Sequence, residues 1–151
     1  MNKKKKILAI SSGGGHWVQL RRLQPAFYGC EIIYSTVNLD LKSDVAGHQF
    51  YRITDATRWN KLLLIKMMCQ ILLIIYKERP DVVISTGAAP GYFAIRIGNV
   101  FGAKTIWLDS IANVEELSLT GKKLKKYANL CLTQWEHVAE KEGVIFGGKV
   151  F

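Results

Sequence analysis

A glycine-rich segment near the start of the chain has the composition of an anion-binding loop. It reads Ser11-Ser12-Gly13-Gly14-Gly15-His16 and follows the apolar run 7–10. Glycine lets backbone amides approach a ligand closely and tolerates positive φ, and a helix that begins after it adds free N–H groups and a partial positive charge. We therefore predict that Ser12, Gly13, Gly14 and Gly15 bind a phosphate or diphosphate.

His16 stands where that helix would begin. A histidine beside a phosphate site can act as a general base or donate a hydrogen bond, so His16 is the candidate base. The alternative is a tight strand-to-helix turn followed by an ordinary polar residue. The loop is not a dinucleotide fingerprint, because Val18 replaces the third glycine, and it is not a P-loop, because no Gly-Lys-Ser/Thr step follows.

Two later loops carry small or polar residues that could contact the same ligand, one spanning 86–91 and one spanning 108–121. The acceptor-binding residues expected in them are Thr86, Gly87, Ala88, Pro90, Gly91, Ser118, Thr120 and Gly121. Polar groups in the second of these loops could bind sugar hydroxyls. Glu115 and Glu116 in that loop are the alternative candidates for the base.

Short apolar segments alternate with helical patterns along the chain, which predicts strands and helices in turn. Strands are expected over 5–11, 31–36, 48–53, 81–86, 104–108 and 130–133. Helices are expected over 16–27, 60–78, 92–101 and 119–127, with a helical turn at 138–142 and a possible last strand in the tail 143–151. In the first helix, Val18, Leu20, Leu23 and Phe27 give the expected inward face.

This alternation predicts an α/β fold, a Rossmann-like doubly wound parallel sheet, with residues 1–151 as a single domain. Ligands of such sheets bind outside the carboxyl ends of the strands. All three loops follow strands, so we expect them to open on one edge of the sheet.

The helix expected over 60–78 is apolar almost all round, since Lys66 and Gln70 are the polar residues within 62–76. It is shorter than the about 20 apolar residues that span a bilayer. A helix on the outside of a sheet buries one face, so we expect the other to contact a membrane surface or a partner protein through Leu63, Ile71 and Ile74. Simple burial in the core is the alternative.

The chain has 151 residues and a net charge of +9, which suits anionic lipid, phosphorylated ligands or nucleic acid. We find no nucleic-acid motif and expect no nucleic-acid partner. Three separated cysteines without a CxxC pair and three single histidines give no metal-site spacing, so neither a metal nor another cofactor is expected. Lysines at 3–6 precede only four apolar residues, too few for a signal peptide.

Five segments, taken together and in order, resemble a known family. They are 12–16, 77–87, 118–122, 133–136 and 146–148. The chain resembles the anchor subunit of the split UDP-GlcNAc transferase of eukaryotic lipid-linked oligosaccharide synthesis, and more closely its bacterial polysaccharide-biosynthesis relatives. The eukaryotic subunit has an N-terminal membrane helix, whereas this chain has lysines at 3–6. Anchoring is therefore expected through the 60–77 helix or through the partner.

The resemblance implies the N-terminal, acceptor-binding half of a GT-B glycosyltransferase, active only with a companion chain that binds the donor. The implied acceptor is a polyprenyl-diphosphate sugar, and the implied donor is a UDP-sugar held mainly by the companion. The expected setting is capsule or exopolysaccharide synthesis at the cytoplasmic face of the plasma membrane. Phe146, Val150 and Phe151 in the apolar tail are expected to contact the companion chain.

Two other functions are compatible with the residues alone. One is a self-contained, small nucleotide-binding enzyme with a Rossmann-like fold. The missing third glycine and the lack of a second domain count against it. The other is a non-catalytic scaffold module that uses the basic surface.

Overall fold

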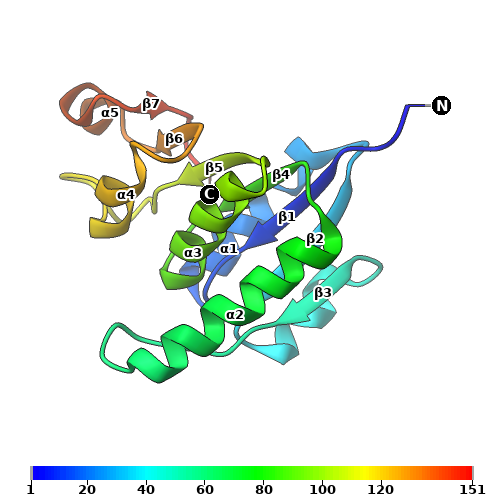
Figure 1. Ribbon diagram of the computed structural model, residues 1–151. Coiled ribbons are helices and arrows are strands. Elements are labelled where there is room, and N and C mark those ends of the chain that lie inside the picture. The colour runs from blue at the N-terminus through cyan, green and yellow to red at the C-terminus, as the bar shows by residue number, and fades with distance from the viewer. Residues whose placement is uncertain (1, 151) are drawn as a thin grey trace.

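The computed structural model describes residues 2–150 and contains one parallel sheet with helices on both faces (Figure 1). The strands are β1 (Lys6–Ile10), β2 (Glu31–Thr36), β3 (Gln49–Arg52), β4 (Val82–Ser85), β5 (Lys104–Leu108), β6 (Leu130–Thr133) and β7 (Ile145–Phe146). The α-helices are α1 (Gly15–Arg22), α2 (Lys61–Glu78), α3 (Ala89–Val100), α4 (Leu119–Leu124) and α5 (Glu136–Glu142), and the 3₁₀ helices are η1 (Gln24–Phe27) and η2 (Leu39–Val45).

The strand order is β3-β2-β1-β4-β5-β6-β7, and every pairing is parallel. The chain builds outward from β1 to β3, then returns to the other side of β1 with β4. At this reversal Ile10 of β1 lies in register with Ser35 on one side and Ser85 on the other. A reversal of this kind opens a crevice at the carboxyl ends of the strands. The predicted doubly wound fold is confirmed.

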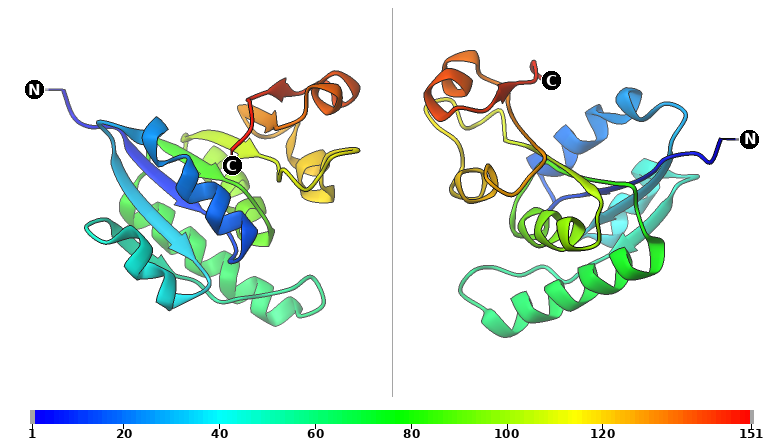
Figure 2. Two further views of the ribbon diagram at one scale, coloured as in Figure 1. Left: turned by 180° about the vertical axis from the view of Figure 1, so that it is seen from behind. Right: turned by 45° about the horizontal axis from the view of Figure 1, so that its top comes forward.

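The core lies in two layers, one on each face of the sheet. Helices α2 and α3 cover one face, where Leu8 and Ile10 pack against Met67 and Ile71 of α2 and Ile95 of α3. Helix α1 covers the opposite face (Figure 2). Because both faces are covered, the strands are apolar at successive positions rather than at alternate ones.

The first helix is shorter than predicted, because α1 ends at Arg22 and the chain continues as η1 to Phe27. Pro25 is tolerated in the first turn of η1, whereas inside a longer α-helix its ring would clash with the carbonyl four residues earlier. The expected inward position of Val18 is wrong, since this side chain is 47% exposed and Trp17 is buried in its place. Leu20 and Phe27 are buried as expected.

Helix α2 begins and ends close to the predicted positions. Asn60 caps its start by accepting a hydrogen bond from the amide of Leu63 at 3.1 Å. Arg79 adopts the left-handed conformation after its last turn, and Pro80 follows. Helix α3 begins at Ala89, three residues before the predicted start, because Pro90 fits the first turn of a helix, where its missing N–H leaves no bond unmade.

Helix α2 divides cleanly into a buried side and an exposed apolar side. Ile71 and Ile74 are buried, so the expectation that they contact a membrane or a partner is wrong. Leu63 is exposed, as expected, and the exposed side also carries Leu62, Ile65, Met68, Leu72, Leu73 and Tyr76. We call these seven residues the α2 stripe.

The division of α2 predicts opposite outcomes for two neighbouring substitutions. Ile71→Glu should lower the free energy of unfolding by about 4 kcal/mol or more, because it removes buried apolar contacts and places an unpaired charge in the core. Leu73→Glu should change it by about 0.5 kcal/mol at most. Urea unfolding followed by circular dichroism measures both, and equal losses would contradict the assignment of the two sides.

Candidate functional site

The glycine loop lies at the carboxyl edge of the sheet, with its ligand side open. Gly14 has φ +64° and caps α1, and Gly15 is the first residue of the helix. A Cβ atom built on Gly14 or on Gly15 would meet no atom within 4 Å. The amide of Ser12 donates to the carbonyl of Gly87 at 2.9 Å, which fixes this loop against the second one. The first helical turn therefore faces open space, as an anion-binding loop requires.

His16 is held by the second loop through two reciprocal hydrogen bonds. Its Nδ1 lies 2.8 Å from the carbonyl oxygen of Thr86, and the Thr86 hydroxyl donates to the carbonyl of His16 at 2.6 Å. A carbonyl can only accept, so Nδ1 carries the proton and Nε2 of the neutral ring carries the lone pair. A Cβ atom on Gly87 would lie 2.5 Å from Nδ1, so a glycine is needed beside the ring. This arrangement presents Nε2 as a proton acceptor.

A cavity of about 250 Å³ adjoins the imidazole and brings residues of the second and third loops together with His16. Its lining includes six predicted site residues, and it adds Ser110 and Asn113 from the third loop. The six are His16, Thr86, Gly87, Ala88, Ser118 and Thr120. Hydroxyl and amide groups of this kind can bind the hydroxyls of a sugar.

Three small residues that were predicted to bind the acceptor are packed inside the protein instead. Pro90 and Gly91 are buried in the first turn of α3, and a Cβ atom on Gly91 would lie 2.2 Å from Oγ of Ser85. A Cβ atom on Gly121 would lie 2.8 Å from a carboxylate oxygen of Asp109. Side chains of β4, β5 and the third loop leave no room beside the two glycines, and Pro90 is buried in the first turn of α3, so the assignment of these three residues to ligand binding is wrong.

The role of Asp109 in organising the third loop could not be predicted from its position in the sequence. Its side chain is 1% exposed and accepts hydrogen bonds from Trp107 Nε1 at 2.9 Å and Asn113 Nδ2 at 3.0 Å. Ser118 donates to it twice, from its amide at 2.8 Å and from its hydroxyl at 2.6 Å. Within residues 2–150 Asp109 forms no ion pair, so these donors stabilise the buried charge. Burial, with the nearby Asp109 charge as the next contribution, raises the pKa of the Cys131 thiol to about 12.

A buried pair of glutamines joins α1 to the ends of β5 and β6. Gln134 Nε2 donates to Gln19 Oε1 at 2.6 Å and to the Asp109 carbonyl at 3.0 Å. Gln19 in turn contacts Ser110 and the amide of Ile111. This network fixes the third loop against the helix that carries His16.

The C-terminal tail reaches the same network. The amide of Val150 donates to Gln134 Oε1 at 2.7 Å, so the backbone at Val150 is bound within its own domain. Phe146 lies in the edge strand β7 and is 43% exposed. Phe151 lies outside the described residues.

Neither alternative base lines the His16 cavity. Glu116 forms an ion pair with Lys122, whose hydrogen bond lowers the pKa of the Glu116 carboxyl, and a lowered pKa weakens a base. Glu115 is exposed, and its backbone carbonyl accepts a hydrogen bond from Lys141. We therefore keep His16 as the candidate and withdraw Glu115 and Glu116.

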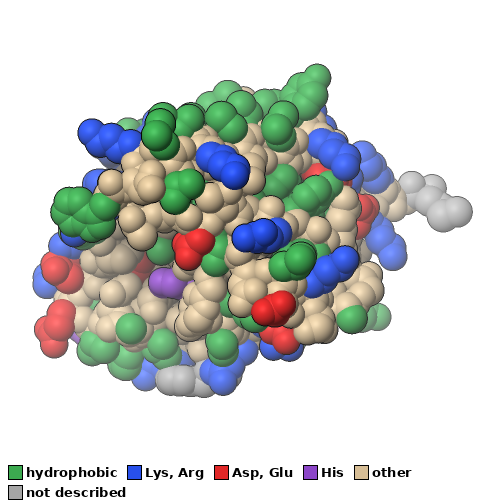
Figure 3. All heavy atoms as spheres, turned by 90° about the horizontal axis from the view of Figure 1, so that it is seen from below, with side chains coloured by type: hydrophobic (Ala, Val, Ile, Leu, Met, Phe, Trp, Pro, Cys, Tyr) green, Lys and Arg blue, Asp and Glu red, His purple; other side chains and the backbone are tan. Residues whose placement is uncertain are grey.

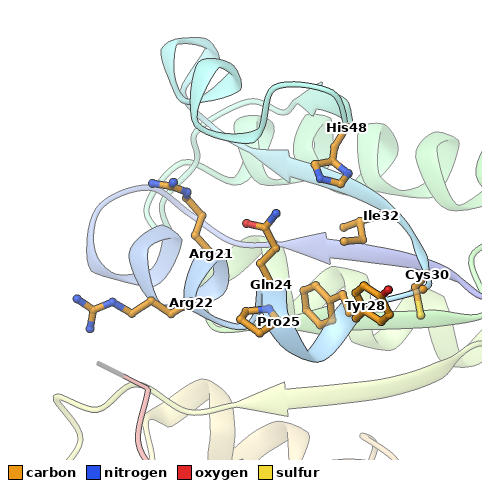
Figure 4. A pocket seen from close by; sticks show the side chains of 10 residues that line it. Arg21, Arg22, Gln24, Pro25, Tyr28, Cys30, Ile32 and His48 are labelled. Atoms are coloured by element: carbon orange, nitrogen blue, oxygen red, sulfur yellow. The ribbon is translucent and has the colours of Figure 1, made fainter.

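A larger cavity of about 810 Å³ lies elsewhere, at the amino ends of β2 and β3 (Figure 4). Arg21, Gln24, Tyr28 and His48 are among its lining residues. It faces away from all three loops, because α1 runs from the carboxyl edge, where His16 lies, to this opposite edge. Size alone therefore does not identify the site here.

The α2 stripe occupies a separate part of the surface. Figure 3 shows hydrophobic side chains gathered along one margin of the molecule, with lysine and arginine side chains among them. Within residues 2–150, no helix combines the length and the apolar composition that crossing a bilayer requires.

Comparison with solved structures places the fold. MurG of Acinetobacter baumannii superposes with a TM-score of 0.71 at 14% identity, over 86% of this chain and 41% of MurG. A glycosyltransferase of Rickettsia africae gives a TM-score of 0.67 at 17% identity, over 95% of this chain and 41% of the other. A UDP-N-acetylglucosamine 2-epimerase of Rickettsia bellii gives 0.70 at 13% identity, over 94% and 43%. The chain is a Rossmann-like domain of the type found in GT-B glycosyltransferases, and it spans less than half of each of these proteins.

Sequence comparison identifies the family. The family model described as "oligosaccharide biosynthesis protein Alg14 like" matches residues 52–149. The UDP-N-acetylglucosamine transferase subunit ALG14 of Yarrowia lipolytica is 30% identical over an alignment of 74 residues, which covers 45% of this chain and 34% of that relative. The chain belongs to the Alg14-like family, which confirms the resemblance to the anchor subunit of the split UDP-GlcNAc transferase.

The hydrogen bonds of Asp109 predict its contribution to stability. Asp109→Ala leaves the buried Trp107 indole N–H and the partly buried donors of Asn113 and Ser118 without their acceptor, and should lower the free energy of unfolding by about 2–4 kcal/mol. Asp40→Ala, at an exposed carboxylate, is the matched control and should change it by about 0.5 kcal/mol at most. Urea denaturation measures both, and similar values for the two variants would contradict the role given to Asp109.

Proposed function

We propose that this chain is the acceptor-binding, membrane-associating subunit of a two-component glycosyltransferase. The enzyme transfers a sugar from a UDP-sugar to a sugar linked to a polyprenyl diphosphate. The observation that carries the proposal is the fixed His16 ring, which adjoins both the open first turn of α1 and a cavity lined by hydroxyl and amide groups. Family membership and the half-length match to GT-B enzymes support it.

The acceptor is proposed to bind with its diphosphate near the amides of Gly14 and Gly15. Its sugar occupies the cavity beside His16, where Ser110, Asn113 and the hydroxyl residues of the loops bind the sugar hydroxyls. The helix N-terminus favours the negative charge of the diphosphate. The loop geometry fixed by Thr86 and Gly87 then determines which sugar hydroxyl faces the imidazole.

In the transfer step, the acceptor hydroxyl oxygen forms a bond to the anomeric carbon of the donor sugar. The bond from that carbon to the UDP oxygen breaks, and UDP leaves with its electron pair. Nε2 of His16 takes the hydroxyl proton and releases it to solvent after transfer. Such a positioned base contributes about 10²–10⁴-fold to the rate.

The companion chain is proposed to bind the UDP-sugar and to stabilise the leaving diphosphate. The Alg14-like family match and the name of the relative, a transferase subunit, support a partner of this kind. The exposed Phe146 in the edge strand β7 is a proposed contact with that partner. The proposed setting is capsule or exopolysaccharide synthesis at the cytoplasmic face of the plasma membrane.

Membrane association is proposed to use the α2 stripe. Single exposed apolar residues are common on protein surfaces, but seven exposed apolar side chains on one helix form a patch of the kind that marks an interaction site. Arg58, Lys61, Lys66 and Lys77 are exposed beside or along the helix and could contact anionic headgroups. A helix lying in the plane of the interface with its apolar side down fits this pattern.

Replacing His16 tests the chemical step. In the complex with the companion chain, His16→Ala should lower kcat by about 10²–10⁴-fold with a modest change in the acceptor KM, because a base acts in the transition state. His48→Ala, in the cavity at the opposite edge, is the control and should retain wild-type kinetics. A normal kcat for His16→Ala would remove this residue as the base.

Replacing Gly15 tests the anion-binding loop without straining the backbone. Gly14 has positive φ, so a side chain there is strained whatever the ligand, whereas Gly15 lies in the helix with open space beside it. Gly15→Val should leave the protein folded, raise the acceptor KM by about tenfold or more through loss of a charge-assisted hydrogen bond, and leave the UDP-sugar KM unchanged. An unchanged acceptor KM would remove the loop from the acceptor site.

A further inference from the structure

A second cavity at the carboxyl edge, of about 320 Å³, lies between the start of α2, the start of α3 and α4. Its walls are largely apolar, with Leu64, Tyr92, Phe93 and Leu119 among them. Its volume falls near the lower end of the range for ligand pockets, about 300–1,000 Å³. It can therefore hold part of an apolar chain.

Two cations border this apolar cavity. Arg58 precedes α2 and Lys123 lies on α4, and both line the cavity and are exposed. Among residues 2–150 neither forms an ion pair, although four other lysine and arginine side chains do. Arg58 stacks on the ring of Trp59, 4.7 Å from its centroid, which leaves its guanidinium N–H groups available. Two unpaired cations beside an apolar wall fit a ligand that is both apolar and anionic.

The position of this cavity between two other surfaces indicates how such a ligand would lie. On one side it adjoins the His16 cavity, since Thr120 lines both and the adjacent residues Ala88 and Ala89 line one each. On the other side the α2 stripe begins, with Leu62 80% exposed. The three surfaces therefore follow one another: the apolar α2 stripe, then the apolar cavity with its two cations, then the polar cavity with His16.

We propose that this cavity binds the first isoprene units and the chain-proximal phosphate of a prenyl diphosphate, with Arg58 and Lys123 contacting the phosphate oxygens. The apolar chain leaves along the α2 stripe, and the sugar lies beyond the phosphates, beside His16. The part of this assignment that places a sugar beyond the phosphates rests on the proposed function. The second phosphate lies on the His16 side of this cavity, between the amino ends of α1 and α3, where the amides of Gly14 and Gly15 face it as in the proposed function.

The assignment is tested by binding of farnesyl diphosphate, a short prenyl diphosphate, to the purified full chain below its micelle concentration. Titration calorimetry compares it with farnesol and with inorganic diphosphate. Farnesyl diphosphate should bind at least about tenfold more tightly than either, because each lacks one half of the recognised chemistry. Equal affinity for inorganic diphosphate or for farnesol would overturn the proposal.

Three substitutions locate the binding. Arg58→Gln and Lys123→Gln should each weaken farnesyl diphosphate binding by about tenfold or more, the effect of losing one charge-assisted hydrogen bond. Lys126→Gln, which removes the same charge from an exposed position just after α4, is the control and should leave the affinity within about twofold. Because all three sites are exposed, the melting temperatures should match the wild type. An equal loss in the control would show that only net charge matters and would overturn the proposal.

Activity of the two-chain complex separates failure of this inference from failure of the proposed function. Sugar transfer that depends on His16 but is unchanged by Arg58→Gln and Lys123→Gln together would leave the function standing and overturn the assignment of this cavity. Farnesyl diphosphate binding that shows the expected dependence on both cations supports the assignment even where the complex transfers no sugar. In that second case only the proposed function fails.

Discussion

The hydrogen bond from His16 Nδ1 to the Thr86 carbonyl joins the two loops that meet at the centre of the sheet. It spans the point where strand order reverses, because His16 follows β1 and Thr86 follows β4. Parallel pairing of β1 with β4 brings the two loops to the same height, and Gly87 supplies the space that the imidazole occupies. Tautomer, ring orientation and the boundary of the sugar-sized cavity all follow from this contact.

The third loop reaches the same edge by a different physical route. It has no regular structure between β5 and α4, so its shape depends on side-chain acceptors placed inside it. The buried Asp109 carboxylate accepts four hydrogen bonds, and the buried pair of Gln19 and Gln134 adds more. A buried carboxylate satisfied only by N–H and O–H donors is costly to disturb, which makes the loop a rigid wall of the cavity.

Much of the fold followed from local patterns in the sequence. The strands over 31–36, 104–108 and 130–133 were predicted with their observed bounds, because short apolar runs between glycine, proline and polar residues are typical of buried strands. The orientation of α2 could not be predicted, since a helix that is apolar all round has no pattern to orient it. Only packing against α3 and the sheet separates buried Ile71 from exposed Leu73.

The candidate site was predicted in part, for a related reason. Sequence position places His16 and Thr86 at the carboxyl edge, and the structure brings them together as expected. Sequence position cannot reveal that Gln19 contacts Gln134, 115 positions away in the chain. Sequence alone also cannot distinguish a glycine that leaves room for a ligand from one that lets a helix pack closely against the sheet. Gly91 is of the second kind, because a Cβ atom there would collide with Ser85 and Trp107.

The central claim is that this domain holds the acceptor while another chain supplies the donor. The direct measurement is sugar transfer from a UDP-sugar panel to a prenyl-diphosphate-linked sugar, made with this chain alone, with the purified companion alone, and with the two mixed. The account predicts turnover only in the mixture, saturating at a fixed ratio of the two chains. Robust turnover by this chain alone would contradict it.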